Sequence, residues 1–208
     1  MLSSLCMSHS DHAEGLDYLF AQAKEIACML PQGLPFVEIG TRAGGSALLF
    51  LQAIKESGIP RPLITVDPYG SLYRSGSEEH LDPTPPGFSD ISFYPPSGEE
   101  KFRNMAAMLS SFCLEFKLTH IHYRLHSKDW VSLWESFGCW IEGEQINKKN
   151  FACVYLDGEH VEDAVEQELS WFFPHMTPGG LIVIDDVQHI RKSALPNIQK
   201  AFVQGQED

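Results

Sequence analysis

Apolar residues follow two different spacings along the chain, and these spacings alternate. A repeat every three to four residues, typical of an amphipathic helix, marks several segments. Short runs rich in β-branched residues, bounded by Gly, Pro or Asp, mark strands between them. The predicted helices are 16–30, 46–56, 102–113, 130–137, 161–172 and 195–202. The predicted strands are 34–39, 63–66, 120–126, 151–156 and 181–184.

Strands that alternate with helices predict an α/β domain with a doubly wound, mostly parallel sheet, because parallel strands need a crossover connection. The run 151–156 has no polar face, which predicts a strand buried on both sides. No repeat or second block of composition occurs, so residues 1–208 are expected to form one domain. A Pro-rich insertion at about 69–98 interrupts it, either as a substrate lid or as a poorly ordered segment. Segment 138–150 is expected to be a surface loop, and 178–180 a turn.

Histidine, cysteine and tryptophan all have simple structural interpretations. His120, His122 and His126 alternate along one predicted strand, and a wet face at the sheet edge explains them more simply than a metal does. The five cysteines are odd in number and form no Cys-x-x-Cys pair, so each is expected to be a small, reduced core residue. The four tryptophans are expected to pack in the core or between helices.

The charge balance excludes several classes of partner. Fifteen Lys and Arg against 28 Asp and Glu give a net charge of −13, which opposes binding to nucleic-acid phosphates or anionic lipid. The apolar runs are too short to span a bilayer, and the first residues lack the basic region of a signal peptide. We therefore expect a cytoplasmic protein that contacts neither nucleic acid nor membrane.

A glycine-rich turn follows the first predicted strand. The segment from Glu38 to Ser46 holds glycines that let backbone approach a ligand, and the next helix offers its N–H groups to an anion. At the end of the second strand, Asp67 is placed to accept hydrogen bonds from a ribose. The turn lacks the G-x-G-x-x-G spacing of nicotinamide-binding proteins, which favours a nucleoside that carries a carboxylate. A tight connection and an Asp-Pro turn are the structural alternatives.

Acidic residues gather at the ends of the last two predicted strands. Segment 151–190 contains eight acids and no Lys or Arg, so its carboxylates repel one another unless a cation offsets them. Asp157, Asp185 and Asp186 are oxygen donors of the kind that Mg²⁺ prefers. The alternative is that these residues cap helices.

These motifs together resemble class I S-adenosylmethionine-dependent methyltransferases, and in particular the metal-dependent O-methyltransferases that include catechol and macrolide-sugar enzymes. The resemblance implies a Rossmann-like fold, S-adenosylmethionine as cofactor and a divalent cation such as Mg²⁺. It is carried by segments 36–46, 65–67, 155–160 and 178–186.

The resemblance also implies roles for individual residues. Asp157, Asp185 and Asp186 would hold the metal, and Glu159 or His160 would be the catalytic base, with Glu159 preferred. The cofactor-binding residues would be Glu38, Gly40, Arg42, Gly44, Ser46, Asp67, His126, Ser127 and Asp157.

The expected function is therefore methyl transfer to a hydroxyl of a small polyhydroxylated molecule, sugar-like or catechol-like. Two alternatives are a non-catalytic binding module with the same fold and a metal-dependent hydroxylase-like relative. Family members continue with a β-hairpin for which this sequence is too short, so we expect that hairpin to be missing. The last strand would then be exposed at the sheet edge unless a homo-oligomer or the Pro-rich segment covers it.

Overall fold

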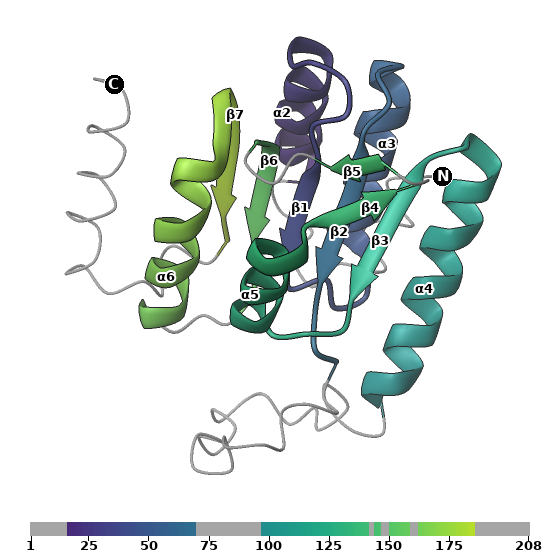
Figure 1. Ribbon diagram of the computed structural model, residues 1–208. Coiled ribbons are helices and arrows are strands. Elements are labelled where there is room, and N and C mark those ends of the chain that lie inside the picture. Colours follow the sequence, from purple (N-terminus) through teal and green to yellow (C-terminus); the bar gives the residue numbers. More distant parts are fainter. Residues whose placement is uncertain (1–15, 70–96, 142–143, 147–149, 159–161, 186–208) are drawn as a thin grey trace.

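The structure is a computed structural model that describes residues 16–69, 97–141, 144–146, 150–158 and 162–185 (Figure 1). Its main sheet has five strands in the order β3-β2-β1-β6-β7, and each neighbouring pair is parallel. All five carboxyl ends therefore lie at one edge of the sheet, which confirms the predicted doubly wound α/β fold. The strands are β1 (Phe36–Ile39), β2 (Pro62–Val66), β3 (Thr119–Tyr123), β6 (Phe151–Leu156) and β7 (Met176–Ile184).

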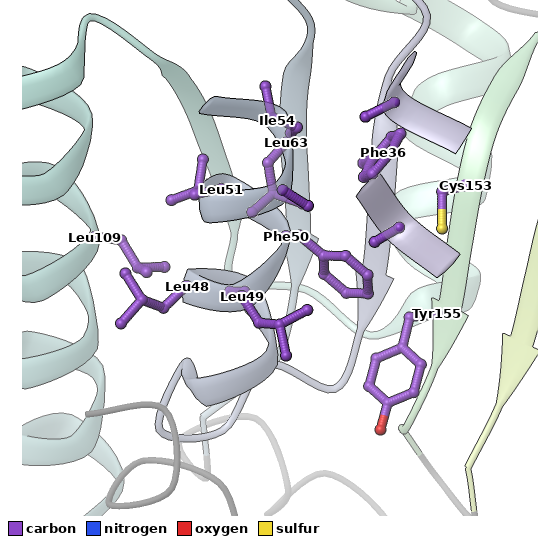
Figure 2. Close-up of a cluster of buried hydrophobic side chains, with 14 of the residues drawn as sticks. Phe36, Leu48, Leu49, Phe50, Leu51, Ile54, Leu63, Leu109, Cys153 and Tyr155 are labelled. Carbon is purple, nitrogen blue, oxygen red and sulfur yellow. The ribbon is translucent and has the colours of Figure 1, made fainter. Parts of the chain in front are cut away.

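Helices cover both faces of this sheet and enclose two hydrophobic clusters. One cluster lies between the sheet and three helices and contains Phe36, Phe50 and Leu63 (Figure 2). The other contains Val37 and is shared with the remaining two helices. Adjacent residues of β1 thus enter opposite cores, as the two-residue period of a strand requires. The helices of the first face are α2 (Leu16–Met29), α3 (Gly45–Ser57) and α4 (Ser97–Phe116), and those of the second are α5 (Ser127–Phe137) and α6 (Glu162–Phe172).

Three connections differ from the sequence prediction. Within the segment expected as a loop, β4 (Cys139–Ile141) and β5 (Glu144–Ile146) pair in an antiparallel hairpin. Strand β7 begins well before the predicted residue 181 and runs through the expected turn at 178–180. Its pairing with β6 shifts register between Phe151 and Cys153, an irregularity that accommodates proline and glycine in a strand. A short 3₁₀ turn, η2 (Phe173–His175), precedes β7.

The histidines of β3 are not on a wet face, although β3 is an edge strand of the described sheet, as predicted. The Thr65 hydroxyl lies 2.8 Å from both His120 Nε2 and His122 Nδ1. The ring of His122 also packs against Tyr69 and Phe102. Burial lowers the pKa of His120 to about 4 and that of His122 to about 3, so both rings are neutral near pH 7.

Most of the described cysteines and tryptophans lie in the core, as expected. Cys113, Cys139 and Cys153 are buried, but Cys28 is exposed on α2, so the prediction was wrong for that residue. Trp130 and Trp134 are fully buried and pack on each other. Of the helices that the structure describes, none has the length and apolar character needed to cross a membrane.

A buried arginine fastens the end of α2 to the sheet. Arg61 is only 3% exposed, and its guanidinium donates to the carbonyls of Ala27, Leu30 and Leu34 at 2.8, 3.0 and 3.4 Å. We expect Arg61→Met to lower the free energy of unfolding by about 3 kcal/mol, because the carbonyls at the helix end lose a charged donor. Urea denaturation measures this change.

The matched control removes a cation from the surface. Lys24 and Glu56 form an exposed ion pair 2.8 Å long, which solvent screens, so Lys24→Met should cost much less stability than Arg61→Met. Equal effects of the two substitutions would contradict the structural role assigned to Arg61.

Candidate functional site

The carboxyl ends of β1, β2, β6 and β7 meet at one edge, and backbone hydrogen bonds join the turns that follow them. The amide of Gly40 donates to the carbonyl of Val66 at 2.8 Å, which ties the turn after β1 to the end of β2. Asp157 N–H donates to Ile39 O at 2.8 Å, and Asp185 N–H donates to Leu156 O at 2.9 Å. The strand order reverses beside β1, so the site lies where parallel α/β sheets bind ligands.

Two glycines of the turn after β1 have backbone positions that a side chain would not fit. Gly40 has a φ of +91°, and a Cβ placed on it would lie 1.9 Å from the Asp157 carbonyl oxygen. Gly44, the N-cap of α3, has a φ of +82°, and its Cβ would lie 2.7 Å from Met105 Cγ. The glycines therefore allow the turn to pass directly against β6 and α4, as well as to approach a ligand.

Glu38 is the most deeply buried acid of the site. Its side chain is fully buried, and the Ser46 hydroxyl donates to its Oε1 at 2.5 Å. Burial raises the pKa of Glu38 to about 8, and the hydrogen bond from Ser46 opposes that rise only in part. Glu38 is therefore mostly protonated near pH 7. Ser46, which the resemblance assigns to the cofactor, is hydrogen-bonded to Glu38 here.

Asp67 joins the glycine turn to the end of β2. Its Oδ2 accepts the backbone N–H of Arg42 at 2.9 Å, and its Oδ1 accepts that of Tyr69 at 2.8 Å. Burial raises the pKa of the Asp67 carboxyl, while these backbone donors lower it. Each carboxylate oxygen keeps a second lone pair, so the predicted contact to a ribose remains available.

Asp157 and Asp185 lie side by side at the ends of β6 and β7. Burial raises the pKa of Asp157 to about 8, Arg42 opposes this, and Asp185 raises it further both by its charge and through a hydrogen bond between the two side chains. Burial raises the pKa of Tyr155, and the charges of Asp157 and Asp185 raise it further, so its hydroxyl lies within electrostatic reach of this pair. Figure 2 shows the Tyr155 hydroxyl directed toward this end of the strand. The convergence predicted from the strand order is thus confirmed for these two acids.

The donor set for a metal is incomplete among the described residues. Those residues contain no group of three or more His, Cys, Asp or Glu side chains suited to hold an ion. Two of the three predicted metal ligands, Asp157 and Asp185, do lie together. Asp186 and the two candidate bases, Glu159 and His160, lie outside the described residues.

The last two predicted cofactor residues stand where β3 passes into α5. His126 is the N-cap of that helix, and its carbonyl accepts the amides of Asp129 and Trp130. Ser127 begins α5. The amide of Asp67 donates to Tyr123 O at 3.1 Å, so the end of β3 is adjacent to the backbone of Asp67. Both residues therefore follow the end of β3, on the same edge of the sheet as Asp67.

Two tyrosines of this site had no such role in the sequence analysis. Tyr69 was only the first residue of the predicted Pro-rich insertion, and Tyr155 was one of the six residues of the predicted strand 151–156. The structure gives Tyr69 a hydrogen bond to the Arg42 carbonyl and places Tyr155 within electrostatic reach of Asp185. Their proximity in sequence to Asp67 and Asp157, two residues away in each case, was the available signal.

Comparison with known proteins gives one family match. The sequence profile of the family described as Methyltransferase domain matches residues 37–187, from the second residue of β1 to beyond the end of β7. No curated protein matches the chain.

Solved structures with a similar arrangement have low sequence identity. The methyltransferase PaMTH1 of Podospora anserina, with S-adenosylhomocysteine bound, is 11% identical, with a TM-score of 0.49 over 100% of this chain and 77% of that one. The calicheamicin methyltransferase CalS11 is 14% identical, with a TM-score of 0.49 over 91% and 68%. The O-methyltransferase NovP is 14% identical, with a TM-score of 0.43 over 94% and 72%.

Proposed function

Because this chain belongs to the family of methyltransferase domains, we propose that it transfers a methyl group from S-adenosylmethionine to a hydroxyl of a small polyhydroxylated molecule, with Mg²⁺ bound beside the reacting oxygen. The family match confirms the predicted class of enzyme, a class I S-adenosylmethionine-dependent methyltransferase. The hydroxyl acceptor, its sugar-like or catechol-like character and the metal are the proposed parts.

The observation that carries the proposal is the meeting of a glycine turn with buried acids at the switch point of the sheet. The turn from Gly40 to Gly44 presents backbone and the α3 N-terminus, which suit the carboxylate of a methionine moiety. Asp67 retains lone pairs for ribose hydroxyls, and the end of β3 lies next to it. The nucleoside would therefore extend from the β1 turn toward β3.

The acids on the other side of the turn support a cation site. Asp157 and Asp185 face each other closely enough to share a hydrogen bond, and the charge of Asp185 disfavours ionisation of Asp157. A divalent cation would favour the ionised form of this pair and, when bound, would lower the pKa of a substrate hydroxyl. Asp157 and Asp185, with Asp186 as the predicted third oxygen donor, would hold it. Glu159, or alternatively His160, would take the hydroxyl proton.

Calorimetry with S-adenosylhomocysteine, with and without Mg²⁺, tests the proposal. We expect the folded protein to bind the nucleoside and also to bind Mg²⁺. Methylation of a polyhydroxylated acceptor should then depend on Mg²⁺. Nucleoside binding without methylation of any such acceptor would favour a binding module, and metal binding without nucleoside binding would favour a hydroxylase-like relative.

A single substitution tests the metal ligands. Asp185→Asn keeps the size of the side chain but removes its charge, so Mg²⁺ affinity should fall by at least about tenfold while nucleoside binding persists. Isothermal titration with Mg²⁺ alone measures this loss. Asp17→Asn, which removes an exposed carboxylate from α2, is the control and should leave Mg²⁺ affinity unchanged. Unchanged affinity in Asp185→Asn would refute the assignment of Asp185 to the metal.

A further inference from the structure

A closed set of three hydrogen bonds links the turn after β1 to the residues after β2. Arg42 and Tyr69 each donate a backbone N–H to one oxygen of the Asp67 carboxylate. The Tyr69 hydroxyl then donates to the Arg42 carbonyl at 2.6 Å. Both polar groups of the Arg42 backbone are therefore held, one by Asp67 and the other by Tyr69.

The backbone conformation of this unit requires such support. Arg42 has a φ of +45° and Tyr69 a φ of +48°, values that residues other than glycine seldom adopt. Strained residues of this kind persist where surrounding contacts fix them, and they concentrate at binding sites. Here each of the two residues bonds to the other and to the same carboxylate.

The ring of Tyr69 is itself held in place. Tyr69 is 5% exposed, and its ring centroid lies 5.4 Å from that of Phe102 on α4 and 5.4 Å from that of His122 on β3. The hydroxyl is thus presented to Arg42 from a packed position, with little freedom to turn away. Such a donor fixes its acceptor more firmly than a mobile surface side chain does.

The side chain of Arg42 gives the unit a functional consequence. Its positive charge lowers the pKa of Asp157, so the guanidinium lies within electrostatic reach of that carboxylate. In segment 37–60 it is one of only two cationic residues, the other being Lys55 on α3. The backbone conformation of Arg42 therefore determines the position of this positive charge relative to Asp157 and Asp185 and to the glycine turn.

We propose that Tyr69 is a positioning residue of the nucleoside site, which holds Arg42 and the glycine turn in the conformation that receives the amino-acid part of the ligand. This inference rests on the proposed function. Tyr69 acts through Arg42 and Asp67 and does not itself contact the ligand. Loss of its hydroxyl should therefore weaken ligands that possess the amino-acid part and spare ligands that lack it.

Binding measurements with two ligands distinguish a positioning role of Tyr69 from a general contribution to stability. S-Adenosylhomocysteine has the amino-acid carboxylate and ammonium, whereas 5′-methylthioadenosine has only the thioether and the nucleoside. For Tyr69→Phe, calorimetry should show an S-adenosylhomocysteine affinity about tenfold weaker and a 5′-methylthioadenosine affinity changed less than about twofold. Asp67→Asn should weaken the binding of both ligands, because the proposed function has Asp67 accept hydrogen bonds from the ribose that both ligands contain. Tyr18→Phe, the same change at an exposed position of α2, should alter neither affinity.

A second measurement on the wild-type protein applies if Tyr69→Phe does not fold. The amides of Arg42 and Tyr69 donate to the same carboxylate, so S-adenosylhomocysteine should slow the hydrogen exchange of both together. Slower exchange at only one of them would overturn the inference, as would equal losses for the two ligands in Tyr69→Phe. Absence of S-adenosylhomocysteine binding by folded wild-type protein would overturn the proposed function, and this inference with it.

Discussion

Gly40→Ala is expected to lower the free energy of unfolding by more than about 4 kcal/mol, a loss that only severe steric or polar defects in a core produce. The added Cβ would lie 1.9 Å from the carbonyl oxygen of Asp157, 2.4 Å from its carbonyl carbon and 2.7 Å from the amide nitrogen of Gly158. All three are backbone atoms, so the clash cannot be relieved by rotating a side chain. Strands β1 and β6 would have to move apart at the centre of the sheet.

A second glycine isolates the steric part of this effect. Gly33 has a φ of +80°, similar to that of Gly40, but a Cβ there would meet no atom within 4 Å. Gly33→Ala should therefore cost only the backbone strain of a left-handed residue, about 1 to 2 kcal/mol. Urea denaturation of both variants measures the difference. If Gly40→Ala is no less stable than Gly33→Ala, the turn does not lie against β6 as the structure places it.

The arrangement of the sheet could be predicted because its signals are local. Each strand is a short apolar run and each helix an apolar stripe, and alternation of the two leaves few topologies for a parallel sheet. The hairpin of β4 and β5 could not be predicted, since its three-residue strands are too short to show a period. Pro178 was misleading for a different reason. Proline and glycine ordinarily mark turns, but an edge strand with shifted register tolerates them.

Only those parts of the site that directly follow a strand could be predicted from the sequence. The position of Asp157 next to Asp185 follows from two adjacent parallel strands, and the turn at Gly40 follows from its glycines. The bond from Ser46 to Glu38 and the one from Tyr69 to Arg42 depend on how a helix start and a loop fold back, which no spacing in the sequence encodes. The histidines of β3 illustrate the same limit. Alternation indicated a polar face, but it could not show that Thr65, Tyr69 and Phe102 cover that face.

Glu38 is expected to make the stability of the protein fall as the pH rises from about 4.5 to about 8. Its pKa is about 8 in the folded protein and about 4.5 when exposed, because burial penalises the carboxylate. Between these values the folded state binds more protons than the unfolded state, so each pH unit removes up to about 1.4 kcal/mol of unfolding free energy. Below pH 4.5 and above pH 8 this contribution no longer changes with pH.

Glu38→Gln should remove that contribution, because the amide has the size of a protonated carboxyl and cannot ionise. Urea denaturation at several pH values between 5 and 8 should show a shallower decline than in the wild type, by about 1.4 kcal/mol per pH unit. Some decline should remain, since Asp157 also has a raised pKa of about 8. Glu56 provides a control of opposite sign. Its hydrogen bond from Lys24 lowers its pKa, so its contribution to stability is present at neutral pH and is lost as the pH falls through the acidic range. Glu56→Gln should therefore leave the slope between pH 5 and 8 unchanged. An unchanged slope in Glu38→Gln would show that Glu38 is ionised in the folded protein, and the acids of the site would then need a cation at neutral pH even without substrate.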